Sequence, residues 1–138
     1  MSAETISRPR PLWLSILWSI GAVLAAAFVV VALSIGSDEL SVALKLFPGA
    51  GAPDALFLEP LGYRSLYAVL GGWMAARLAP GAPMIHALVL GAIGTAVSLA
   101  GAIMAAGHEE FGPGWYSWAL VVTTLPLTWV GGRLARRR

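Results

Sequence analysis

The sequence contains no cysteine, and that absence excludes several kinds of chemistry at once. A chain without thiols forms no disulfide, holds no iron–sulfur cluster and offers no cysteine ligand to zinc. It also has no glycine-rich phosphate motif, no nucleophile paired with a base and no paired catalytic carboxylates. We therefore expect a protein that is not an enzyme, with no catalytic residue, no metal site and no cofactor.

Charge is also scarce, at 12% of residues against 58% hydrophobic residues. The charges lie outside the central turns of four apolar runs, at roughly residues 12–35, 62–78, 84–106 and 115–134. Runs of this length cross a bilayer as helices, because lipid offers no partner to unpaired backbone groups. The first run is longer than the 7–15 apolar residues of a signal peptide. The pattern predicts a single all-α domain, residues 1–138, with four transmembrane helices in an antiparallel bundle.

The segments between the runs are sorted by sign. If Met1 lies in the cytoplasm, that side carries the single acid Glu4 and these bases: Arg8, Arg10, Arg77, Arg133, Arg136, Arg137 and Arg138. The other side carries Lys45, Arg64 and these acids: Asp38, Glu39, Asp54, Glu59, Glu109 and Glu110. This bias obeys the positive-inside rule and predicts that both termini are cytoplasmic. The arginines then contact membrane lipids, and nucleic acid is not an expected partner.

The connecting segments differ in kind. Two prolines in residues 79–83 predict a tight turn, so the second and third helices form an antiparallel hairpin. The loop of residues 36–61 is much longer. Four of its apolar residues share one helical face: Leu40, Ala43, Leu44 and Phe47. This face predicts a short helix lying in the outer membrane interface, and the alternative is an irregular loop.

Small residues recur along the third run with a period of seven. We call this set the seam of the third run, and its members are Ala87, Gly91, Gly94, Ser98, Gly101 and Ala105. The second run has two counterparts, Gly72 and Ala76. Without bulky side chains two helix backbones approach closely, so the pattern predicts a helix-packing face. Two interpretations stay open: packing within one bundle, or docking against a second copy or another membrane subunit.

Polar residues near the membrane are functional candidates by default. Arg77 and His86 flank the tight turn, and one hypothesis is that they form a site for an anionic lipid or head group, or a proton-accepting pair. The alternative is that Arg77 extends to the interface and His86 makes an interfacial hydrogen bond. His108 is 22 residues from His86 and roughly 33 Å away along a helix, so one chain cannot form a bis-histidine haem site. A single-histidine ligand to a haem or chlorin-type pigment stays open, whereas His108 and its acidic neighbours indicate a solvated loop.

One stretch resembles a known family. It consists of residues 71–80 (GGWMAARLAP), followed by residues 83–87 (PMIHA) and by Leu90 and Gly91. These motifs are similar to those of small uncharacterised four-span bacterial inner-membrane proteins, in which a Gly-Gly-aromatic helix end leads through a short turn into a histidine-bearing helix. The resemblance covers about forty residues. It implies the fold and the membrane location, and it brings no activity with it.

The apolar runs contain no acidic residue. Proton-coupled drug exporters of similar length depend on one, so we do not predict that function. The leading expectation is a non-catalytic accessory or scaffolding subunit that packs in a homo-oligomer or a larger membrane complex. The alternative is a small-solute or lipid transporter or channel acting as an oligomer.

Overall fold

The computed structural model describes residues 10–47 and 51–136. Four charged residues that the charge pattern assigns to the cytoplasmic side lie outside the described residues: Glu4, Arg8, Arg137 and Arg138. Four long helices make up the fold: α1 (Leu12–Ala43), α2 (Leu58–Leu78), α3 (Pro83–Ala105) and α4 (Gly114–Arg136). Two short 3-10 helices precede α2 and α4: η1 (Asp54–Phe57) and η2 (Glu109–Phe111). The prediction of an all-helical fold with four long helices is confirmed.

The tight turn between α2 and α3 lies where the two prolines predict it. Helix α2 ends at Leu78, and Pro83 is the first residue of α3. Proline suits that position because its missing N–H would have no partner in the first turn. Ala82 precedes it with φ of 45°, a left-handed conformation that is uncommon for a residue with a side chain.

The separate interfacial helix predicted in the first long loop is wrong, because α1 continues without a break to Ala43. Gly36 lies within this helix and does not end it. Side chains beyond Gly36 hold the extension against α2: Ser37 shares a 2.7 Å hydrogen bond with Tyr67, and Ser41 donates one of 2.6 Å to Glu59. These contacts compensate for the roughly 1 kcal/mol that glycine costs inside a helix.

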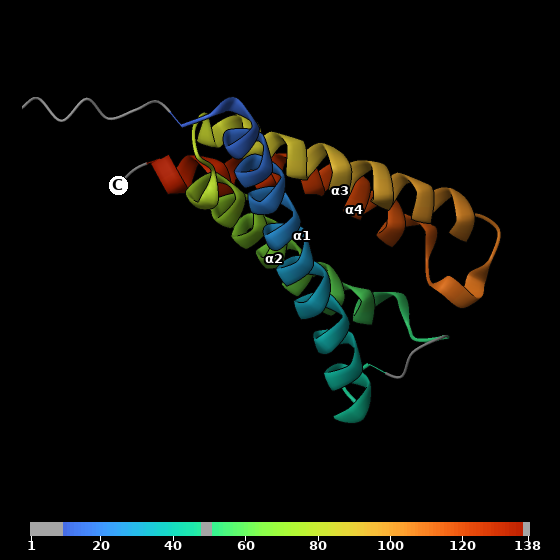
Figure 1. The fold of residues 1–138 in the computed structure, drawn as a ribbon. Helices are drawn as coiled ribbons and strands as arrows, with labels where there is room; N and C mark the ends of the chain where they lie inside the picture. Colours follow the sequence, from blue (N-terminus) through green and yellow to red (C-terminus); the bar gives the residue numbers. More distant parts are fainter. Residues whose placement is uncertain (1–9, 48–50, 137–138) are drawn as a thin grey trace, which may run out of the picture.

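The helices form two pairs that meet at one end and diverge at the other (Figure 1). Helix α1 runs beside α2, and α3 runs beside α4. The most extensive contacts are those of α4 with α2 and α3, whereas α1 packs mainly on α2 and touches α3 little. We call the end with the α2–α3 turn the turn end, and the end with η1 and η2 the open end.

The core consists of small side chains. Ala26, Ala75 and Ala87 are completely buried, and no large side chain among the described residues is. Leu90 is the one leucine in the core, where it packs with Ala26 and Ala75. Most other large apolar side chains are exposed on the outside of the bundle, with Phe57 and Tyr116 as buried exceptions. Such an exterior is typical of helices that pack in lipid through small residues.

Two helices, α1 and α3, are long and apolar enough to cross a membrane by length and composition. The core helix of a water-soluble protein passes the same test, but such a helix is mostly buried. Here only 17% of the most apolar stretch of α1 and 22% of that of α3 is buried within the bundle. This low burial favours a lipid or protein neighbour for both helices over a water-soluble core.

Candidate functional site

Helices α2 and α4 approach each other so closely that only glycine fits at two positions, Gly72 of α2 and Gly131 of α4. A methyl carbon added to Gly72 would lie 2.7 Å from the backbone Cα and C of Thr128, and closer still to its carbonyl oxygen. A methyl carbon on Gly131 would lie 2.7 Å from the backbone nitrogen of Trp73. Ordinary contact between carbon atoms begins near 3.5 Å. The two backbones are therefore in direct contact.

Thr128 is the residue of α4 on which three helices converge. It is 3% exposed, and its hydroxyl donates to the carbonyls of Thr124 (3.0 Å) and Leu125 (2.9 Å). Its backbone faces Gly72 of α2, and its side chain faces Gly91 of α3. The hydroxyl is satisfied within its own helix, so this junction is built for packing.

The seam predicted on α3 follows α4 over only part of its length. Gly91 and Gly94 lie against the side chains of Thr128 and Thr124, and Ala87 lies beside Gly132. Gly101, by contrast, has nothing within 4 Å of the position a methyl carbon would take. The remaining predicted positions divide as follows: Ala76 and Gly72 are buried, and Ser98 and Ala105 are half-buried.

The structure gives Arg77 and His86 different neighbours. The Arg77 guanidinium lies 5.6 Å from the ring centroid of Trp73, on its own helix. His86 is 9% exposed, and its Nδ1 lies 3.1 Å from the carbonyl oxygen of Ala82. A carbonyl only accepts, so Nδ1 is the donor in this contact. Among the described residues no hydrogen bond joins Arg77 to His86, and their joint head-group site stays a prediction.

His86 borders a groove of about 450 Å³ between α1 and α3. Apart from His86 and Ser19, its walls are aliphatic: Ile20, Val23, Leu24, Ile85, Val89 and Ile93. The groove exists because α1 packs on α2 and scarcely on α3. An apolar chain would fit against these walls.

Arginines and tryptophans pair at the turn end of both α2 and α4. Arg77 lies over Trp73, and Arg133 lies over Trp129 with 4.8 Å between its guanidinium carbon and the ring centroid. Each pair is spaced four residues apart, which places both side chains on one helix face. Cation–π contact and an indole at the head-group level both suit a membrane interface.

A polar network joins α1 to α2 at the open end. Asp38 of α1 accepts hydrogen bonds from Tyr63 and Arg64 of α2, and the contact with Arg64 is an ion pair. The two charged side chains are 39% and 32% exposed, so water reaches both. The Arg64 Nε is buried without a hydrogen-bond partner. The network borders a cavity of about 250 Å³, into which Tyr116 of α4 also faces.

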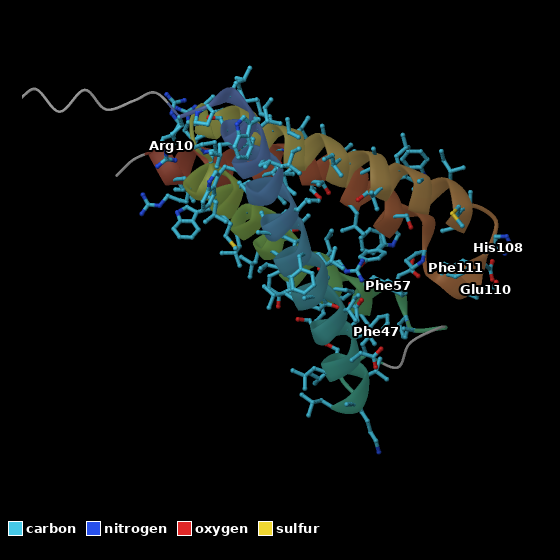
Figure 2. The ribbon with its side chains drawn as sticks, viewed as in Figure 1. Arg10, Phe47, Phe57, His108, Glu110 and Phe111 are labelled. Atoms are coloured by element: carbon cyan, nitrogen blue, oxygen red, sulfur yellow. The ribbon has the colours of Figure 1, made fainter. Side chains whose placement is uncertain are left out.

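Aromatic rings close the same end. Phe57 lies 5.0 Å from Phe47 and 5.3 Å from Tyr116, measured between ring centroids. Figure 2 shows Phe47 and Phe57 together at the open end, and His108 and Glu110 at the tip of the second helix pair. His108 Nδ1 lies 3.5 Å from Glu110 Oε1, and both side chains are exposed. Within residues 10–47 and 51–136 no three His, Asp or Glu side chains gather where they would hold a metal.

In comparisons with known proteins, no family profile, no curated protein and no solved structure matches this chain. The family resemblance of the α2–α3 hairpin therefore stays an expectation.

Sequence reasoning missed the pairing of Asp38 with Arg64. A signal for it was present, since Arg64 and Lys45 are the bases on a side otherwise acidic. A base that breaks the charge bias needs a reason, and a nearby carboxylate is the simplest one.

Proposed function

We propose that this chain is a four-span integral membrane protein of the bacterial inner membrane, with both termini cytoplasmic. We further propose that it acts as a non-catalytic accessory or scaffolding subunit, packed in a homo-oligomer or a larger membrane complex. The distribution of charge along the bundle supports the orientation. Among the described residues, Arg10, Arg77, Arg133 and Arg136 lie at the turn end, and the acids lie toward the open end (Figures 1 and 2).

The observation that carries the subunit role is the uncovered face of α1. This helix stands at the edge of the bundle and packs mainly on α2, with little contact to α3. Leu24, Phe28 and Val31 are 62%, 74% and 55% exposed. Bulky apolar side chains on one edge helix give a second protein a broad surface for packing.

Site-specific photo-crosslinking in intact membranes tests this role. A photoreactive residue at Phe28 is expected to yield one protein adduct of defined mass, from a second copy or another subunit. The same residue at Val97, which is 67% exposed on α3, is the matched control. If both positions give only lipid adducts and the chain is monomeric in mild detergent, the subunit role is wrong.

The orientation is tested by reporter fusions. A reporter after Arg138 is expected to be cytoplasmic, and one inserted within residues 49–53 is expected outside. A C-terminal reporter active only outside would overturn the four-span orientation.

A second candidate function, solute or lipid transport as an oligomer, draws support from the open end. A cavity of about 510 Å³ lies there between the η1 segment and the outer turns of α3 and α4. A homo-oligomer with a hydrated path continuous with this cavity would favour transport, and a stable hetero-complex would favour the accessory role.

A further inference from the structure

Two arginines and a tryptophan surround a hollow at the turn end of α4. The hollow measures about 430 Å³, and its walls are Met84 of α3 with Trp129, Arg133 and Arg136 of α4. The two arginines are three residues apart, which places their side chains on one face of the last helical turn. Arg133 is stacked on Trp129. A stacked guanidinium keeps its N–H groups in the plane of the fork, where they remain free to bind an anion.

Neither arginine is neutralised by a described carboxylate. The ion pairs among residues 10–47 and 51–136 join Arg64 to Asp38 and His108 to Glu110, both toward the open end. The partial negative charge of the helix C-terminus offsets the two positive charges only in part. The hollow therefore holds an excess of positive charge beside a wall formed by Met84 and Trp129.

A second hollow adjoins the first and is apolar. It measures about 320 Å³, and it shares Trp129 and Arg133 with its neighbour while adding Val130 and Leu134. The stacked pair thus separates a basic hollow from an apolar one. A molecule that fills both has an anionic head and a hydrocarbon tail.

We propose that Arg133, Arg136 and Trp129 form a binding site for an anionic phospholipid. The phosphate accepts charge-assisted hydrogen bonds from both guanidinium groups, and one acyl chain lies against Val130 and Leu134. Tryptophan prefers the head-group level, which matches the depth this arrangement requires. This proposal rests on the proposed membrane insertion, and it differs from the head-group site predicted at Arg77 and His86.

The test measures lipid binding to the purified full chain in mild detergent, by native mass spectrometry. Phosphatidylglycerol is the probe, and phosphatidylcholine is the neutral comparison lipid. We expect Arg133→Gln and Arg136→Gln each to weaken phosphatidylglycerol binding about tenfold, which corresponds to roughly 1.4 kcal/mol. Arg10→Gln is the matched control, because Arg10 is also an exposed arginine at the turn end but does not line the hollow. It should change binding less than twofold.

Three outcomes overturn the proposal. Equal affinity for the two lipids would show that charge is not recognised. Weaker phosphatidylglycerol binding in Arg77→Gln, with no change in Arg133→Gln or Arg136→Gln, would place the lipid at the site predicted for Arg77 and His86 instead. Displacement of the lipid by an equal concentration of inorganic phosphate would indicate a site for a free anion. Size-exclusion chromatography and the melting temperature check that each variant is folded. Arg133→Lys should bind phosphatidylglycerol with an affinity between those of the wild type and Arg133→Gln.

A separate measurement keeps this result distinct from the proposed function. Resistance of the chain to carbonate extraction from membranes reports insertion alone. If the chain resists extraction but shows no preference for phosphatidylglycerol, only the lipid site is wrong. If carbonate releases it, the membrane proposal fails as well.

Discussion

Replacing Gly72 by alanine should destabilise the bundle more than any comparable change on its surface. The added methyl carbon would lie 2.7 Å from two backbone atoms of Thr128. Ordinary carbon contacts begin near 3.5 Å, so α2 and α4 must separate by about 0.8 Å or more. The obstacle is backbone, and it cannot rotate away as a side chain would.

The expected cost follows from two opposing effects. Overpacking of a close contact costs about 1–3 kcal/mol, and a rigid backbone obstacle places this site near the upper end. Alanine recovers about 0.5–1 kcal/mol because it orders a helix at less entropic cost than glycine. The net loss is about 2 kcal/mol, which for a chain of this size lowers the melting temperature by roughly 8 °C.

Thermal unfolding in mild detergent, followed by circular dichroism, measures the effect. Gly101→Ala is the matched control, since it lies inside α3 with nothing within 4 Å of the added carbon. That variant should melt at the wild-type temperature or a few degrees above it. Gly131→Ala should resemble Gly72→Ala, and the double variant should lose less than the sum, because one separation relieves both clashes. Equal melting temperatures for the Gly72 and Gly101 variants would refute the close approach of α2 and α4.

Two further predictions concern the ends of helices, and a third concerns the ion pair between α1 and α2. Lys45 follows the end of α1 and has a φ of 59°. At this helix end the Leu46 N–H donates to the Ser41 carbonyl and the Lys45 N–H donates to the Val42 carbonyl. Glycine fits this helix-ending motif better than lysine, so Lys45→Gly should raise the melting temperature by a few degrees. An unchanged melting temperature would contradict the left-handed conformation of Lys45. Ala82→Gly should stabilise the chain for the same reason by up to about 1 kcal/mol, in the same melting assay. For Asp38 and Arg64, a double-mutant cycle to alanine should give a coupling energy of about 1 kcal/mol, and this energy should fall at high salt. A coupling energy of zero would mean that solvent screens the ion pair completely.

The helices were predictable from the sequence because their signals are local. A run of apolar residues without charge predicts a helix, and the two prolines in residues 79–83 predict the turn between α2 and α3, whereas Pro126 lies inside α4 and does not end it. The α2–α3 turn shows this well, since α3 begins at Pro83 itself. The end of α1 shows the limit. Its extension past Gly36 depends on Ser37 and Ser41 reaching side chains of α2, and such partners are not visible in a local pattern.

The seam was predictable in its first half and not in its second. An ideal helix drifts about 20° per seven residues relative to a strict heptad, unless the helices supercoil. The two heptads from Ala87 to Gly101 therefore rotate the predicted stripe by about 40°. Gly101 turns outward, and Ala102, which is 3% exposed, takes the buried position. A seven-residue period therefore predicts which face packs over about two helical turns, but not over the roughly five turns of the whole seam.

The two ends of the bundle are held by different kinds of contact, and this difference bears on how easily each end rearranges. At the turn end, Gly72 and Gly131 bring backbone against backbone, and only a separation of whole helices alters such a contact. At the open end, Phe57 and Tyr116 meet through their rings, and Asp38 meets Arg64 through rotatable side chains. Packed side chains have alternative rotamers and exposed ion pairs exchange readily with water, so the open end has the lower barrier to rearrangement.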